Sequence, residues 1–219
     1  MTKEEELKIF EKNKEHTARE VLIETATRLF SIHGLEGTST RDIAKDSGLN
    51  ISLISYYFGG KEGLYKAVLS SYADRTSHKV NALFSQVSEA DLNRDSFKTI
   101  MRAFVREVVT SRFQEGDVNK ILEREMMDGL PFAREIFENN FSQIVRGIVR
   151  LYELGQERKF IRADLNPYVL FFSLIHANDM FMNMSQCQTS LQVHMIKIPE
   201  QMDQYIEQMY FIFVEGVII

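Results

Sequence analysis

The segment between Gly34 and Glu62 carries short polar and aromatic side chains that could form hydrogen bonds from one face of a helix. It predicts two short helices joined by a tight turn around Gly48. On the second helix, apolar residues recur at positions that would face inward: Leu53, Ile54, Tyr57 and Phe58. The opposite face carries Ile51, Ser52, Ser55 and Tyr56. Such a pair, with an exposed polar and aromatic second helix, is typical of a DNA-reading helix-turn-helix.

Local signals should position this pair. Ser39 followed three residues later by Asp42 predicts a capping box at the start of the first helix. Gly48 can adopt the left-handed backbone conformation that reverses the chain. Asn50 can cap the second helix, which we expect from Ile51 to Phe58.

Other residue types that support covalent or metal chemistry do not form a recognisable pattern. The five His residues and Cys187 lack metal-ligand spacing, so we expect no metal site and no cofactor. Cys187 and His194 could act as nucleophile and base, but no third residue is placed to orient them. The chain also lacks a phosphate-binding glycine loop. We therefore expect a protein that is not an enzyme.

Composition indicates an ordinary globular chain of 219 residues, 44% hydrophobic and 26% charged. Pro and Gly are scarce while Met and Phe are plentiful, which favours an all-helical fold. A single cysteine excludes an internal disulfide and suits a reducing compartment. No signal peptide and no membrane-length apolar run are found, so we expect a cytoplasmic protein without membrane association.

Net charge slightly weakens the hypothesis of nucleic-acid binding. The formal charge is -5, and the first 70 residues hold 10 Lys and Arg against 11 Asp and Glu. Affinity for DNA would then depend on a few placed cations, helix N-termini and neutral donors, and on dimerisation.

Helical periodicity continues along the rest of the chain, which predicts an all-α fold. Besides the central pair, we expect helices at about 16–33, 61–87, 95–113, 118–127, 131–156, 167–186 and 199–217. Pro131, Pro167 and Pro199 each stand where a helix should begin, because proline suits the first helical position. The charged residues 1–15 form either a solvated tail, an extension of the first helix, or an arm that grips DNA through Lys8, Lys12 and Lys14.

The stretch from Ala18 to Leu69 resembles the DNA-binding domain of the TetR family of bacterial transcriptional regulators. The residues that carry the resemblance are Leu29, Phe30, Gly34, Thr38, Ser39, Arg41 to Ala44, Gly48, Tyr57, Phe58, Lys61, Glu62, Leu64 and Ala67 to Leu69. The resemblance implies a three-helix DNA-binding head at 1–62. It also implies a long linking helix and a helical effector-binding and dimerisation body, together at 63–219.

The family pattern further implies which side chains meet DNA. Many members have Gly where this chain has Ser52 and Tyr where it has Ser55, so the main aromatic contact is expected from Tyr56. Phosphate contacts would set the register and base contacts the specificity. The expected DNA-binding residues are Thr38, Ser39, Thr40, Arg41, Lys45, Ile51, Ser52, Ser55, Tyr56 and Lys61.

The body offers a dimer interface and candidate effector contacts. The helix at 167–186 is apolar nearly all round and the last helix has an apolar stripe, so the resemblance implies a four-helix interface between two copies. Candidate effector-binding residues are Met101, Phe104, Phe137, Phe141, Phe172, His176, Asn178 and Met180. Each of them also suits an ordinary core or interface position. Arg124, between Glu123 and Glu125, is expected in an ion-pair cluster, with a ligand contact as the alternative.

Two hypotheses about function follow. The first is a homodimeric repressor that binds a near-palindromic double-stranded operator. A small apolar or aromatic effector would release it by shifting the fourth helix. The second is a helical small-molecule-binding or scaffold protein whose helix-turn-helix is vestigial.

Overall fold

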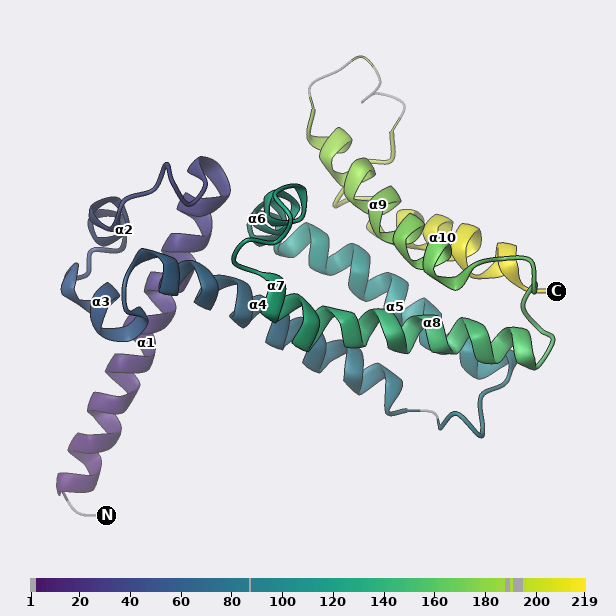
Figure 1. Ribbon diagram of the computed structural model, residues 1–219, viewed down its shortest axis with the longest axis horizontal. Helices are drawn as coiled ribbons and strands as arrows, with labels where there is room; N and C mark the ends of the chain where they lie inside the picture. Colours follow the sequence, from purple (N-terminus) through teal and green to yellow (C-terminus); the bar gives the residue numbers. More distant parts are fainter. Residues whose placement is uncertain (1–2, 87, 188–189, 191–194) are drawn as a thin grey trace. The chain divides into compact units, whose positions relative to one another are not determined.

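The fold is all-α, as the sequence predicts. Figure 1 shows the computed structural model, which describes residues 3–86, 88–187, 190 and 195–219. Of residues 3–16 and residue 186 it describes the backbone alone. Across this described part, the only β-type pairing is an isolated bridge between Ile161 and Ile218. None of the described helices is long and apolar enough to cross a membrane.

The helices follow one another with short connections. The first four are α1 (Lys3–His33), α2 (Thr40–Ser47), α3 (Ser52–Phe58) and α4 (Lys61–Phe84). They are followed by α5 (Arg94–Gln114), α6 (Gly116–Met127), α7 (Arg134–Ile136), the π-helical segment η1 (Phe137–Phe141), α8 (Ser142–Glu157), α9 (Pro167–Gln186), α10 (Met202–Phe213) and the 3-10 turn η3 (Glu215–Val217).

The chain divides into two compact units, and the division falls inside α4. Unit 1 consists of Met1–Asp74 and Asp117–Phe137, and unit 2 of Arg75–Gly116 and Glu138–Ile219. The sequence-based boundary lies at residues 62 and 63, at the start of α4. Unit 1 therefore contains α1 to α3, most of α4 and also α6, a helix that the sequence reading assigns to the body.

The core of unit 1 holds the helix-turn-helix against α1 and α4. Leu22, Phe30, Ile43, Ile54 and Leu64 are fully buried. The ring of Phe30 meets Tyr65 edge-on, with centroids 5.1 Å apart. Because each short helix contributes a single fully buried side chain, their positions depend on the longer helices on which they pack.

Unit 2 is a bundle in which α5, α8, α9 and α10 pack on one another (Figure 1). An aromatic cluster lies at one level of its core, where Phe97 contacts Tyr152 and Phe160 with centroids 5.5 and 5.7 Å apart. At another level Phe104 of α5 stacks on Phe171 of α9 at 6.4 Å. The buried hydroxyl of Tyr152 donates to the carbonyl oxygen of Phe213 at 2.9 Å.

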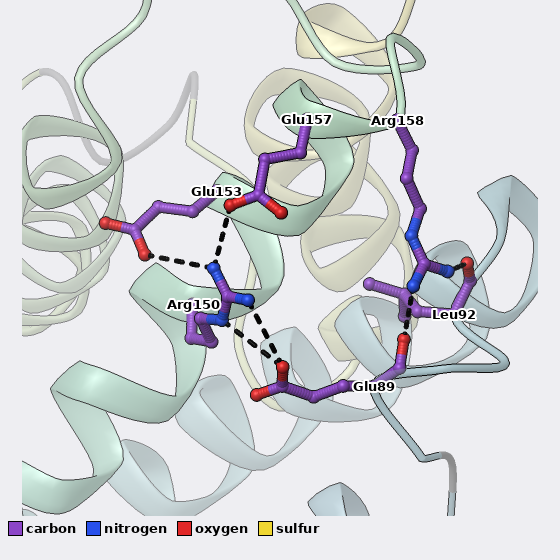
Figure 2. A network of polar contacts seen from close by, with 6 residues as sticks. All are labelled: Glu89, Leu92, Arg150, Glu153, Glu157 and Arg158. Carbon is purple, nitrogen blue, oxygen red and sulfur yellow. Dashed lines mark hydrogen bonds and ion pairs between the residues drawn. The ribbon is translucent and has the colours of Figure 1, made fainter.

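Two arginines of α8 and its C-terminal end hold the loop between α4 and α5, as Figure 2 shows. Arg150 contacts Glu89 at 3.3 Å and Glu157 at 2.9 Å. Arg158 donates to the carbonyl oxygens of Glu89 and Leu92. Exposed ion pairs contribute little one at a time, so this network mainly fixes where the loop runs on unit 2.

Several predicted helix boundaries are wrong. The first helix begins at Lys3 rather than at residue 16, so the charged N-terminal residues from Lys3 extend α1. The predicted helix at 131–156 is replaced by a turn, α7, η1 and α8. That turn contains Gly129 and Leu130 with φ of 79° and 63°, and the Glu125 carboxylate accepts the amides of Phe132 and Ala133.

The last predicted helix also begins three residues late, at Met202. The amides of Gln201 and Met202 bond back to the carbonyl oxygens of Lys197 and Pro199, at 2.7 and 3.1 Å, and so form a turn. At α9 the prediction is confirmed: Pro167 opens the helix, and the Asn166 side chain accepts the amides of Tyr168 and Val169.

Candidate nucleic-acid interface

The predicted capping box closes the first turn of α2. The Ser39 hydroxyl accepts the Asp42 amide at 3.2 Å, and the Asp42 carboxylate accepts the Ser39 amide at 3.1 Å. Hydrogen bonds from the Ser39 side chain and backbone hold the pKa of Asp42 below its ordinary value. The cap fixes where α2 begins, and it also places a negative charge at the end of the helix that was expected to face phosphates.

The turn between the two helices has the predicted conformation. Gly48 has φ of 68°, in the left-handed region that a side chain would disfavour. The Asn50 side chain then accepts both the amide and the hydroxyl of Ser52, at 2.9 and 2.8 Å. The helix α3 begins at Ser52 instead of Ile51, so its N-cap position is Ile51, which makes no side-chain cap bond, and Asn50 accepts the first helical amide from one position earlier than predicted.

The two faces of α3 divide as the sequence predicts. Ile54 is fully buried, while Leu53, Tyr57 and Phe58 are partly buried. The other face is exposed, and Tyr56 projects furthest, with 72% of its surface accessible. The exposed set is Ile51, Ser52, Ser55 and Tyr56. The helix thus presents a hydroxyl-rich surface with one aromatic side chain.

Two of the expected phosphate contacts have roles inside the fold. Thr38 is only 2% exposed, and its hydroxyl donates to the carbonyl oxygen of Gly34 at 2.8 Å. Its side chain therefore cannot contact a phosphate, whereas those of Ser39 and Thr40 are accessible. Lys61 is partly buried and donates to the carbonyl oxygen of Leu35 at 2.8 Å. An ammonium group has three protons, so Lys61 can still donate to a second acceptor.

Positive charge on α2 comes from Arg41 and Lys45, which are both exposed. Within the described part of the chain, neither forms an ion pair with a carboxylate. Arg28 of α1, in contrast, pairs with Asp46, and Arg19 lies over the ring of Phe58 at 5.4 Å. Arg41 and Lys45 are therefore the cations of the helix pair that remain available to phosphates.

The close contact between the end of α3 and the start of α4 requires a glycine. A Cβ atom at Gly63 would lie 1.7 Å from the carbonyl oxygen of Phe58, the last residue of α3. We expect Gly63→Ala to lower the free energy of unfolding by about 1–3 kcal/mol, because backbone has to move to admit the methyl group. Thermal unfolding measures this, and Gly116→Ala is the matched control, since a Cβ there meets nothing within 4 Å. Equal unfolding temperatures for the two variants would contradict the close contact.

Two residues of α6, a helix predicted to belong to the body, form hydrogen bonds within unit 1. Arg124 was expected in an ion-pair cluster, but its guanidinium donates to the carbonyl oxygens of Phe30 and Ser31, at 2.8 and 2.7 Å. Glu125 is 3% exposed and accepts the Tyr65 hydroxyl at 3.0 Å. Burial and the nearby Glu125 raise the pKa of that tyrosine. The buried position of Glu125 could have been found from its spacing, because it shares a helix face with Ile121 and Leu122.

The candidate effector-binding residues fall into separate groups. Met101 and Phe104 are buried core residues of α5, and Asn178 is 1% exposed. Phe137 and Phe141 are partly buried, at the two ends of η1. Phe172, His176 and Met180 lie on the exposed face of α9. The set does not form one cluster, because Asn178 faces the opposite side of α9 from those three.

A buried polar cluster lies where α5 meets α9. Arg112 pairs with Asp179 at 2.9 Å and donates to Asn183 at 2.9 Å, and its side chain is 6% exposed. Among the residues that the structure describes, the buried polar atoms without a hydrogen-bond partner include Ser111 Oγ, Asn178 Oδ1 and the Tyr205 hydroxyl. Ser111 and Asn178 adjoin the two members of the ion pair in sequence. Burial and the charge of Asp179 raise the pKa of Tyr205.

Comparison with known families points to gene regulation. Residues 22–68 match the model of the family described as bacterial regulatory proteins, tetR family. The chain is 24% identical over 155 residues to the probable HTH-type transcriptional regulator YttP of Bacillus subtilis, covering 70% of this chain and 72% of that protein. It is 29% identical over 143 residues to the HTH-type transcriptional dual regulator CecR of Shigella flexneri, covering 61% and 62%.

Solved structures share the fold. The ketosteroid transcriptional regulator KstR2 of Mycobacterium tuberculosis superposes with a TM-score of 0.71 at 18% identity, over 92% of this chain and 95% of that one. The match extends over both units and so covers the bundle as well as the helix-turn-helix.

Proposed function

The chain belongs to the TetR family of bacterial regulatory proteins, and we propose that it is a homodimeric repressor that a small molecule releases from its operator. The observation that carries the proposal is the outward face of α3, with Tyr56 72% exposed on a helix whose other face is buried. A face of this kind has no role in the packing of unit 1, and its hydroxyl groups and aromatic ring suit base edges in a major groove.

In the proposed complex, α2 and α4 hold the DNA backbone and α3 reads bases. Ser39, Thr40, Arg41 and Lys45 contact phosphates from α2, and Lys61 does so from the start of α4. Ile51, Ser52, Ser55 and Tyr56 meet base edges. Thr38, which belonged to the expected set, instead supports the turn from within because its side chain is buried.

The proposed dimer forms through the exposed apolar stripe of α9 and the end of α10. Val169, Phe172 and Met180 are 63%, 43% and 64% exposed, and they recur at helical spacing around His176. Phe211 and Ile212 of α10 are 64% and 56% exposed. An apolar stripe of this length is unusual on a monomer and favours a self-complementary interface.

The proposed effector site lies at the buried polar cluster of α5 and α9. A buried polar atom without a partner destabilises the fold by about 1–3 kcal/mol, so Ser111, Asn178 and Tyr205 together favour a bound molecule that satisfies them. Such a molecule would need both hydrogen-bond donors and acceptors. It would also have apolar parts that suit the ring of Phe181, which stacks on Tyr205 with centroids 4.3 Å apart.

Binding of the full-length protein to the DNA that flanks its own gene, measured by fluorescence anisotropy across a salt series, tests the proposal. We expect one fragment to bind at least about 1,000-fold more tightly than a scrambled fragment of the same length. Equal affinity for all fragments, or no binding to any, would favour a helical ligand-binding protein with a vestigial helix-turn-helix.

A further inference from the structure

The turn between α1 and α2 is held by side chains from several elements of unit 1. The Gly34 amide bonds to the carbonyl oxygen of Phe30 at 2.9 Å, and the Thr38 hydroxyl donates to the Gly34 carbonyl at 2.8 Å. Lys61, from α4, donates to the Leu35 carbonyl. Ser39, which caps α2, follows directly after this turn. The position of α2 therefore depends on how the turn is held.

Arg124 holds the same turn from α6. Its two terminal nitrogens donate to the carbonyl oxygens of Phe30 and Ser31, which lie in the last turn of α1. The last four carbonyl groups of a helix lack partners within the helix, and the C-terminal end attracts a positive charge. A guanidinium with two parallel donors meets both requirements at once. The contact between Arg124 and Phe30 joins residues that are 94 positions apart in the sequence.

Glu125 fixes the part of α6 from which Arg124 extends. Its carboxylate accepts the Tyr65 hydroxyl of α4 and the amides of Phe132 and Ala133, at 3.0, 3.0 and 2.9 Å. Arg124 and Glu125, adjacent in sequence, thus connect α6 to both α1 and α4.

We infer that Arg124 is a positioning residue for operator binding: it sets the α1–α2 turn, and through it α2, without touching DNA. The inference rests on the proposed function, because it assigns Arg124 a part in that same DNA-binding surface. It follows that removing the guanidinium weakens specific binding while the number of phosphate contacts stays the same.

The test compares Arg124→Gln with Lys120→Gln in the full-length protein. Lys120 lies on the same helix and carries the same charge, but it pairs only with Asp117 within the described residues. We expect Arg124→Gln to weaken binding to the specific fragment about 5- to 50-fold, and Lys120→Gln to leave it unchanged. The slope of log affinity against log salt should be the same for all three proteins, since it counts phosphate contacts. Hydrogen exchange at the Gly34 and Thr38 amides should become faster only in Arg124→Gln.

The outcomes separate the inference from the proposed function. If the unmodified protein binds no fragment specifically, the proposed function fails. If it does, but Arg124→Gln binds equally well, the positioning role is overturned. A reduced salt slope in Arg124→Gln would also overturn it, because Arg124 would then contact a phosphate directly. Should Arg124→Gln lower the unfolding temperature, Arg124→Lys replaces it, which keeps the charge, lacks the paired donors and is expected to show intermediate affinity.

Discussion

Tyr56→Ala should strongly weaken selective DNA binding while the protein remains folded. The side chain is 72% exposed, and its only ring contact among the described residues is with Tyr57, at 4.9 Å between centroids. A good base contact contributes about 1–3 kcal/mol, and a dimer loses two of them, so we expect affinity for the specific fragment to fall about 30-fold or more. Anisotropy titration with specific and scrambled fragments measures the loss.

Comparison with Tyr56→Phe shows how much of the lost DNA affinity is due to the ring and how much to the hydroxyl. If the ring stacks or packs on bases, Tyr56→Phe should keep most of the affinity. If the hydroxyl accepts or donates a hydrogen bond, it should behave like Tyr56→Ala. Unchanged unfolding temperatures are expected for both variants. Full selectivity in Tyr56→Ala would contradict the assignment of α3 as the reading helix.

Phe172→Asp should convert the protein into a monomer. Phe172 is 43% exposed in the single chain and lies in the middle of the apolar stripe of α9. The proposed dimer would bury the new carboxylate beside its symmetry mate, and burying an unpaired charge destabilises an interface by several kcal/mol. Light scattering should give half the mass of the unmodified protein. Specific DNA affinity should fall about 100-fold or more, because the second head no longer binds in an intramolecular step.

Phe113→Asp is the matched control. Phe113 of α5 is 44% exposed, nearly the same as Phe172, but it lies outside the stripe of α9 and α10. This variant should remain dimeric and bind DNA normally. A dimeric Phe172→Asp, or a monomeric unmodified protein, would be incompatible with the proposed interface.

The helix-turn-helix could be predicted because the interactions that form it are local. The capping box joins residues three apart, the Gly48 turn needs one glycine, and Asn50 accepts the amide two residues later. Spacing alone also predicts that Ile54 is buried and Tyr56 exposed, since positions two apart on a helix face nearly opposite directions. These features depend on a few consecutive residues, so a single sequence contains them.

The side-chain partners of this surface could not be predicted in the same way. Thr38 is buried. Lys61 donates to Leu35 because α4 returns to the end of α1, a contact that spans 26 residues. Arg124 reaches Phe30 from α6. From the sequence alone, Arg124 is expected to pair with the acidic residues beside it, because its distant backbone partners are unknown. Such a long-range contact explains why the internal hydrogen bond of Lys61 was not predicted.

The body was predicted as helical, but the sides of its helices were not assigned. An α9 that is apolar nearly all round gives no indication of which face is buried. In the structure, Asn178 faces the interior, whereas Phe172, His176 and Met180 face outward. The position of Arg112 on α5 could not be anticipated either, because its partners Asp179 and Asn183 lie about 70 residues further along the chain.

A hydroxyl-radical footprint on the specific fragment tests the central claim most directly, namely that two copies of α3 read one DNA site. We predict two protected patches on one face of the duplex, related by a two-fold axis and centred about 10–10.5 base pairs, or a multiple of that spacing, apart. Guanine N7 methylation within each patch should interfere with binding, as major-groove reading requires. A single patch, or protection that is the same at every sequence, would contradict the account.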